Sequence, residues 1–392
     1  MDYYFVQKAA KCRQRVYDDY AFNENVRIGR GSYGQVYKAR EIDDENGKQN
    51  YALKEVELTH YSPSTFREIA LYREIKHPNI IDLLKVYFSY SHQKAWLLFD
   101  YAEYDLHSMI KFYRNTELTL FPLKMPYVMK KSCLYQILLG VKYLHDNWIL
   151  HRDLKPENIM VMGEGPQRGC IKIADMGMAR IFHAPMKPLG DVDTVVVTSW
   201  YRAPELLLAS RHYTKAIDMF SIGCIFAEIL TNLPIFASTP ETNPQPVRSP
   251  YQKNQLDRIF SVMGYPTLAS WPELKHIPEY TKMTQEIARS KYAQCSLAKY
   301  MKAFNVTKHE LSFHLLSKML VMDPKKRIST NEALGHKYFT ELPHPTKDVF
   351  HYFNKLIPFP PRKYLSTKIE PPKFLQKERK IRKASYLTER NI

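Results

Sequence analysis

The sequence has few cysteines and lacks a long uncharged apolar run. Its five cysteines among 392 residues are widely spaced, odd in number and without metal-ligand spacing. We therefore expect reduced thiols in a cytosolic or nuclear protein. The longest apolar stretch, residues 219–236, includes Ser221 and Glu228, so it predicts a buried helix and not a membrane segment. No apolar signal-peptide core follows Met1, so we do not expect secretion.

Acidic residues are in deficit. The chain has 57 Lys and Arg against 40 Asp and Glu, which gives a formal net charge of +17. This balance favours acidic or phosphate-bearing partners without identifying them. The basic run at residues 379–383 is consistent with a solvated tail, a nuclear localisation signal or nucleic-acid binding. Because no DNA- or RNA-reading motif accompanies it, we expect no direct sequence-specific nucleic-acid binding.

Composition and periodicity change along the chain. Residues 3–20 mix apolar and basic side chains without Gly or Pro, which predicts an amphipathic helix. Short β-rich runs follow to about residue 99, and helical spacing dominates from 106 to 339. The last fifty residues are rich in Pro, Lys and Arg, and we expect much of them to be extended or disordered. The predicted class is α+β, divided into an N-terminal helix (1–20), a small β-rich lobe (21–102), a helical lobe (103–339) and a basic tail (340–392).

A glycine-rich segment at residues 29–36 reads G-R-G-S-Y-G-Q-V. Its glycines let a loop between two strands approach a triphosphate, where backbone N–H groups can reach phosphate oxygens. Alone the pattern is weak, and a dinucleotide-binding fingerprint is the alternative. However, Val36 follows at strand spacing and Lys54 comes twenty residues after Gly34 on a second apolar strand. These features favour a strand-turn-strand loop over one that begins a helix.

Four further segments follow in a fixed order. They are Y-A-L-K at 51–54, H-R-D-L-K-P-E-N at 151–158, D-M-G at 175–177 and A-P-E at 203–205. Together with residues 29–36 they match the signature set of protein kinases. The chain therefore resembles a eukaryotic protein kinase, which implies a bilobal fold with a small β-rich lobe and a larger α-helical lobe, and phosphoryl transfer from ATP with Mg²⁺.

The resemblance assigns roles in catalysis. Asp153 is expected to accept or orient the proton of the substrate hydroxyl, and Lys155 to offset charge on the transferring phosphoryl group. Asn158 and Asp175 are expected to bind Mg²⁺. Thr198 is expected to bond to Asp153 and Lys155, a pattern typical of Ser/Thr specificity. A surface turn is the alternative for any one of these acidic residues, but all the polar positions occur in the right order.

The resemblance also assigns residues to ATP binding. Lys54 is expected to contact the α- and β-phosphates, oriented by a carboxylate from a nearby helix. Glu68 is the preferred candidate and Glu74 its competitor. The nucleotide-binding residues it implies are Ile28, Gly29, Gly31, Ser32, Tyr33, Gly34, Val36, Ala52, Lys54, Phe99, Asp100 and Ala102.

Three other positions resemble structural residues of the kinase fold. Glu205 is expected to pair with Arg327 inside the helical lobe. Asp218 resembles the residue that braces the catalytic loop. Phe220 stands where most relatives carry Trp, and we expect a change of packing there without loss of activity.

Two segments are similar to those of cyclin-dependent kinases. Residues 63–68 (P-S-T-F-R-E) resemble the cyclin-binding helix, and residues 195–205 (V-V-V-T-S-W-Y-R-A-P-E) resemble the end of the activation segment. In that family the counterpart of Arg202 holds the backbone near Val197 in a shape that accepts proline after the target residue. Because proline has no N–H, no donor is left unpaired there. A proline-directed Ser/Thr kinase is implied.

One branch fits best, the Mediator-associated kinases that pair with cyclin C. The similar stretches are 96–103, 145–153, 161–166, 172–177 and 211–218. The resemblance implies docking of the N-terminal helix on cyclin C, association with Mediator kinase-module subunits, location in the nucleus, and Ser/Thr-Pro substrates that include the RNA polymerase II C-terminal domain. A cell-cycle kinase with a different cyclin remains the alternative, because residues 63–68 are closer to that group.

Activation is expected to involve an arginine cluster. Most cyclin-dependent kinases clamp a phosphothreonine of the activation segment with three arginines, whose counterparts are Arg67, Arg152 and Arg180. The acceptor position holds Asp193, with Thr194 beside it. A carboxylate carries less charge and fewer acceptor oxygens than a phosphate. Either Asp193 orders the segment in part and a partner protein completes it, or Thr194 is phosphorylated.

Other functional classes fit less well. A catalytically dead scaffold predicts loss of Lys54, Asp153 or Asp175, and all three are present. A mitogen-activated kinase predicts Thr-x-Tyr in the activation segment, which has no Tyr before Tyr201.

Overall fold

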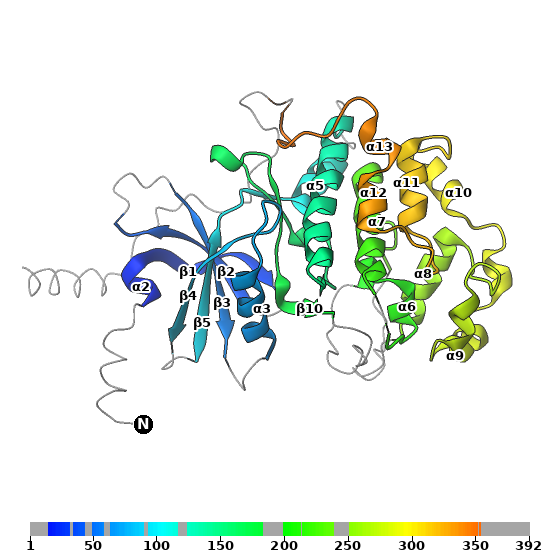
Figure 1. Cartoon of the computed structure of the whole chain (residues 1–392), viewed down its shortest axis with the longest axis horizontal. Coiled ribbons are helices and arrows are strands. Elements are labelled where there is room, and N and C mark those ends of the chain that lie inside the picture. Colours follow the sequence, from blue (N-terminus) through cyan, green and yellow to red (C-terminus); the bar gives the residue numbers. More distant parts are fainter. Residues whose placement is uncertain are drawn as a thin grey trace, which may run out of the picture. The chain divides into compact units, whose positions relative to one another are not determined.

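Two compact units make up the described part of the chain. Residues 15–74 and 82–102 belong to the first unit, and residues 75–81 and 103–353 to the second. Figure 1 labels many of their helices and strands. The structure is a computed structural model that describes residues 15–31, 34–43, 49–58, 63–89, 93–116, 124–182, 199–212, 214–238, 251–351 and 353.

The first unit is a five-stranded antiparallel sheet with one helix of three turns. Its strand order is β1-β2-β3-β5-β4, and α3 (Pro63–Glu74) lies between β3 and β4 in the chain. Burial alternates along the second half of β2, because successive side chains of a strand point to opposite faces and one face of the sheet covers a core. The strands are β1 (Tyr20–Gly31), β2 (Gly34–Glu41), β3 (Tyr51–Glu57), β4 (Leu83–Ser89) and β5 (Lys94–Asp100).

An aromatic cluster anchors the start of this unit. The Phe22 ring packs on Trp96 with centroids 5.1 Å apart and on Tyr37 at 5.7 Å. A single helical turn, α2 (Val16–Asp19), precedes β1, and Asp19 Oδ2 accepts hydrogen bonds of 2.7 Å from Lys85 Nζ and Tyr87 Oη. The predicted N-terminal helix is therefore one turn long within the described residues, and residues 3–14 lie outside them.

The second unit is built around two buried helices. α5 (Tyr127–Asp146) and α7 (Ala216–Thr231) pack side by side (Figure 1), and nearly every residue of α7 is buried, as its apolar sequence predicts. None of the described helices combines the length and the apolar character needed to cross a membrane. The other helices are α4 (Leu106–Thr116), α6 (Pro204–Leu207), α8 (Lys253–Met263), α9 (Tyr280–Glu286), α10 (Leu297–Lys302), α11 (Leu311–Met319), α12 (Thr330–Leu334) and α13 (Lys337–Thr340).

Short strands in the second unit position the loops between helices. β8 (Ile159–Val161) pairs with both β6 (Tyr104–Asp105) and β9 (Ile171–Ile173), and β7 (Ile149–Leu150) pairs with β10 (Arg180–Ile181). The backbone between β7 and β8, and that between β9 and β10, therefore leave from paired strands. These two loops carry Asp153 and Asp175.

A buried ion pair holds the helical unit together. Arg327 Nη1 and Nη2 donate to Glu205 Oε1 and Oε2 over 2.7 and 3.0 Å, and both side chains are buried. The predicted contact between these residues is confirmed. The cysteines in the described ranges, at positions 133, 170, 224 and 295, are free thiols.

The helical unit continues past residue 339, the end that its periodicity predicts. Residues 341–351 form an extended strap that packs on α5 and on the loop before β9. Lys131 Nζ donates to the Glu341 carbonyl over 2.9 Å, and Phe350 is fully buried. Val349 N donates to the Gly169 carbonyl over 3.1 Å. Pro- and Lys-rich composition concealed this segment because many of its contacts are made by backbone groups. The ion pair of Arg168 with Asp348 and the buried side chains of Val349 and Phe350 add to them.

Gly34 packs directly against the backbone of β3, which generates a stability prediction. A Cβ added at Gly34 would lie 1.8 Å from the Glu55 carbonyl oxygen, whereas one added at Gly29 would meet only Val36 at 3.9 Å. Gly34→Ala is therefore expected to destabilise the first unit by about 1–3 kcal/mol. Thermal unfolding of Gly34→Ala and of the control Gly29→Ala measures the loss of stability. Equal Tm values for Gly34→Ala and the matched control Gly29→Ala would contradict the prediction.

Candidate active site

Lys54 forms a buried ion pair in the first unit. It lies on β3, and its Nζ is 2.7 Å from Glu68 Oε1 on α3. Both side chains are less than a tenth exposed, whereas the competitor Glu74 is exposed. The predicted pairing of Lys54 with Glu68 is therefore confirmed as a contact. Pairing compensates for the removal of both charges from water, and it holds the ammonium in one position.

The residues assigned to the nucleotide gather on neighbouring strands of the same sheet. Gly29 on β1 is paired in register with Val36 on β2, and Ala52 on β3 with Phe99 on β5. Gly31 and Gly34 face each other at the end of the β1–β2 pair. Ile28 is on β1, Asp100 ends β5, and Ala102 is the last described residue of the first unit. Ser32 and Tyr33 lie outside the described residues.

The catalytic-loop candidates are in contact in the second unit. Lys155 Nζ lies 2.7 Å from Asp153 Oδ2, and Asn158 Nδ2 donates to the same oxygen over 3.1 Å and to the Asp153 carbonyl over 2.8 Å. Asp153 and Asn158 are buried. The 3₁₀ turn Pro156–Asn158 reverses the chain and brings Asn158 back to Asp153. The three polar side chains therefore form one hydrogen-bonded cluster.

His151 joins this loop to the segment that carries Asp175. Asp153 N donates to His151 Nδ1 over 3.3 Å, so the ring proton belongs on Nε2, which lies 3.1 Å from the Ala174 carbonyl. Ala174 N in turn donates to the Asn158 carbonyl over 2.9 Å. Asp175 has a left-handed backbone with a φ of 67°, a conformation that costs energy and recurs at functional sites.

Asp218 on α7 is hydrogen-bonded to the backbone of the same loop. It is fully buried, and it accepts hydrogen bonds from the backbone N–H groups of His151 and Arg152, each 2.9 Å long, and from His145 Nε2 at 3.0 Å. Burial alone would raise the pKa of Asp218, but the hydrogen bond from His145 and the neighbouring donors bring the pKa below its ordinary value. The carboxylate is thus ionised, and it holds Arg152 in a left-handed conformation with a φ of 69°.

Asn158 and Asp175 fit a hard divalent cation. Because Asn158 Nδ2 donates to Asp153, its amide oxygen is the atom that can act as a ligand. An amide oxygen and a carboxylate are ligands that Mg²⁺ accepts, and this ion commonly completes its shell with substrate phosphates and water. No group of three or more His, Cys, Asp or Glu side chains that could hold a metal alone occurs among the described residues.

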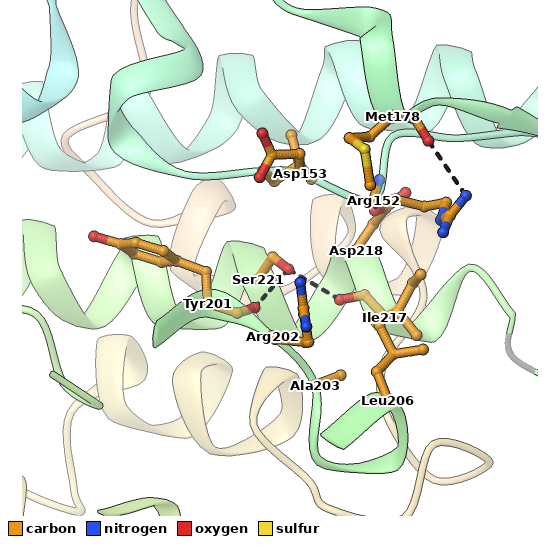
Figure 2. A pocket seen from close by; sticks show the side chains of 11 residues that line it. Arg152, Asp153, Met178, Tyr201, Arg202, Ala203, Leu206, Ile217, Asp218 and Ser221 are labelled. Atoms are coloured by element: carbon orange, nitrogen blue, oxygen red, sulfur yellow. Dashed lines mark hydrogen bonds between the residues drawn. The ribbon is translucent and has the colours of Figure 1, made fainter. Parts of the chain in front are cut away.

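The segment beside the catalytic loop begins with the 3₁₀ turn Ser199–Tyr201. Figure 2 shows a pocket lined by Arg202 together with Arg152, Asp153 and Ser221. Burial lowers the pKa of Arg202, and the Arg152 charge adds to this effect while Asp153 opposes it. Val197, which is assigned to the substrate site, and Thr198, which is assigned to catalysis and Ser/Thr specificity, lie outside the described residues.

The regulatory arginines belong to different units. Arg67 lies on α3 of the first unit, whereas Arg152 and Arg180 lie in the second, Arg180 on β10. Arg152 Nη1 is 3.5 Å from the Met178 carbonyl (Figure 2). Asp193 and Thr194 lie outside the described residues, so the acceptor for these arginines stays a prediction.

One buried carboxyl near the site was missed as a site residue. Glu228 on α7 accepts a hydrogen bond of 2.7 Å from Tyr201 Oη, and both residues are buried. Burial raises the pKa of Glu228 to about 7, and the charge of Glu157 adds to the rise. The signal in the sequence is an isolated acid within the apolar stretch 219–236, which argues against a membrane span but does not by itself indicate a site.

Glu228 predicts a pH dependence of stability. In the unfolded chain its pKa is near 4.3, so the folded protein binds more protons between that value and about 7. The stability that this group contributes is therefore present below about pH 4.3 and lost as the pH rises through about 7. Glu228→Gln keeps an acceptor for Tyr201 and removes the titration.

Thermal unfolding of wild type and Glu228→Gln at about pH 5 and about pH 8 tests this. The Tm of the variant relative to wild type should rise between the two values. A constant difference would contradict the assigned titration.

Comparison with known proteins agrees with the site geometry. Residues 22–339 match the family described as protein kinase domain. A Drosophila melanogaster protein named cyclin-dependent kinase 8 is 52% identical over 93% of this chain and 79% of its own length. A Caenorhabditis elegans protein of the same name is 44% identical over 91% of this chain, and here the chain spans 61% of the relative's length.

A solved structure shows the same fold. The yeast RNA Pol II CTD kinase CTDK-1 complex contains a chain with a TM-score of 0.65 and 30% identity, which matches 81% of this chain and 96% of that chain. The kinase domain implies binding of ATP and a divalent metal. The chain belongs to the protein kinase family and, within it, to the cyclin-dependent kinase 8 group of protein serine/threonine kinases.

Proposed function

We propose that the chain is the cyclin C-dependent kinase of the Mediator complex, which transfers the γ-phosphate of ATP to Ser/Thr-Pro sites of transcription proteins, including the C-terminal domain of RNA polymerase II. The observation that carries the proposal is the braced cluster of Asp153, Lys155 and Asn158 above Asp218. The names of the relatives favour this group over a cell-cycle kinase. This function places the protein in the nucleus.

Asp153 accepts the proton of the substrate hydroxyl. Its Oδ2 is held by the Lys155 ammonium at 2.7 Å and by the Asn158 amide at 3.1 Å, so the carboxylate has a defined orientation before substrate binds. Lys155 is close enough to offset charge on the transferring phosphoryl group. Most of the rate enhancement in phosphoryl transfer comes from such alignment and charge stabilisation.

Asn158 and Asp175 would hold Mg²⁺ through their side-chain oxygens. When bound, the cation neutralises charge on the phosphates. The His151 ring, bonded to the Ala174 carbonyl, keeps the segment before Asp175 attached to the catalytic loop. Lys54, fixed by Glu68, contacts the α- and β-phosphates.

The partner is a cyclin, and we propose cyclin C. Phe66 lies on α3, the helix that resembles the cyclin-binding helix, and it exposes nearly half of its surface, so its ring is available to a protein partner. Residues 1–14 supply a second contact for cyclin C. Mediator kinase-module subunits bind the assembled pair.

Asp153→Asn tests the activity. With cyclin C present, transfer of labelled phosphate to a Ser-Pro peptide of the polymerase tail should fall by about 10²–10⁴-fold, because the general base is lost. Asp146→Asn is the matched control. Its carboxylate is exposed, pairs with Lys142 and lies in the same lobe. Equal activity of the two variants would contradict the proposal.

Deletion of residues 1–14 tests the cyclin contact. The cut must stop there, because Val16, Tyr20 and Phe22 are core residues and Asp19 is tied to β4. We expect weaker binding to cyclin C, with a Tm within about 2 °C of wild type, which corresponds to less than 1 kcal/mol. Titration calorimetry measures the affinity. Unchanged affinity would exclude a docking role for residues 1–14.

A further inference from the structure

A buried glutamine on α8 connects the turn Ser199–Tyr201, which follows the residues assigned to the substrate, to the rest of the second unit. Gln255 is 1% exposed, and its Oε1 accepts hydrogen bonds from Ser199 Oγ at 3.3 Å and from Ser238 Oγ at 2.6 Å. Its Nε2 donates to the Phe236 carbonyl over 3.0 Å. The Trp200 indole N–H donates to the Ser238 carbonyl over 3.1 Å. One amide therefore joins α8, residues 236–238 and the turn at Ser199–Tyr201.

The stability of α8 does not explain this amide. The helix already buries Leu256, Ile259 and Phe260 completely. A buried amide is costly unless it is hydrogen-bonded, and a leucine of similar size would avoid the cost. Polar networks of this kind fix one geometry among several that apolar packing would permit. The hydrogen bonds of Gln255 all lead to backbone or side chains beside the substrate segment.

The attached residues directly follow those assigned to substrate recognition. Ser199 comes one position after Thr198 and two after Val197. The following residues are held from α7, because Ser221 Oγ donates to the Tyr201 carbonyl over 2.8 Å (Figure 2) and Tyr201 Oη donates to Glu228. Arg202 N closes the turn on the Ser199 carbonyl at 3.0 Å. On the α8 side, the attachment of the turn runs through Gln255.

We propose that Gln255 is a positioning residue for substrate selection: through Ser199 and Ser238 it sets the geometry of the segment that accepts proline after the phosphorylated residue. This rests on the proposed proline-directed activity. Loss of the amide is expected to change peptide recognition and to leave ATP binding unaffected, since the hydrogen bonds of Gln255 within the described residues go to Ser199, Ser238 and Phe236, none of which is assigned to the nucleotide.

Steady-state kinetics of Gln255→Leu in the cyclin C complex test the proposal. The kcat/KM for a Ser-Pro peptide should fall by about 10–100-fold, because displacement of a positioning group by about 1 Å has effects of that size. The kcat/KM for a matched peptide with Ala in place of the proline, the Ser-Ala peptide, should fall less. The KM for ATP should stay within about twofold of wild type. Ser199→Ala should also lower the ratio of kcat/KM for the Ser-Pro peptide to kcat/KM for the Ser-Ala peptide.

Two controls separate positioning from general destabilisation. Lys131→Met replaces another long buried polar side chain of the same unit, and Ser132→Ala removes the hydroxyl of a buried serine. Both residues hold the C-terminal strap. The ratio of kcat/KM for the Ser-Pro peptide to that for the Ser-Ala peptide should equal the wild-type ratio in both variants, even if their Tm is lower. If Gln255→Leu and Lys131→Met have the same Ser-Pro to Ser-Ala ratio, the proposal is overturned.

Hydrogen–deuterium exchange gives a readout that does not need catalysis. In Gln255→Leu the peptide that covers residues 199–202 should exchange about tenfold faster than in Lys131→Met. If wild type does not phosphorylate Ser-Pro peptides, the proposed function fails, and the exchange experiment alone decides the role of Gln255. Equal exchange in the two variants overturns that role. If wild type is active and proline-selective and Gln255→Leu has the same peptide selectivity as wild type, only the positioning role of Gln255 is overturned and the proposed function stands.

Discussion

The hydrogen bonds of the Asp218 carboxylate are the interaction on which the candidate active site depends. This side chain is fully buried in α7 and accepts the N–H groups of His151 and Arg152. Buried carboxylates are tolerated only when they are satisfied in this way. Since Arg152 has a left-handed backbone, the two bonds stabilise a shape that the loop would otherwise avoid. Asp153 follows immediately in the chain.

A single helix organises both the catalytic loop and the substrate segment. Asp218, Ser221 and Glu228 are spaced along α7 by three and seven residues, which places them on one face of a helix. Asp218 holds the catalytic loop, while the other two hold Tyr201 through its carbonyl and its hydroxyl. The surrounding apolar packing makes α7 rigid, so these polar side chains have fixed positions. Gln255 on α8 supplies the matching attachment for Ser199.

Local motifs explain which parts of the site could be predicted from the sequence. Lys54, Asp153, Asn158 and Asp175 occur in short segments whose residue types follow from phosphate and metal chemistry, and the contact of Lys54 with Glu68 is present. The resemblance also predicted the contact of Glu205 with Arg327 across 122 positions. It missed contacts between distant residues that belong to no recognised motif.

Gln255 is a clear case of such a missed contact, because its partner Ser199 is 56 positions away. The C-terminal strap is another, since Thr346 N donates to Ser132 across 214 positions. No local pattern distinguishes these residues from solvated ones, and only the fold brings them together.

The most direct test of the central claim is the kcat of Asp218→Asn for a Ser-Pro peptide with cyclin C bound. Asparagine offers one acceptor oxygen and directs an NH₂ group at a backbone N–H or at His145. If the Asp218 carboxylate holds the catalytic loop, kcat should fall by about 100-fold or more, with the KM for ATP nearly unchanged and a folded protein by circular dichroism. A folded variant with the kcat of wild type would contradict this role of Asp218.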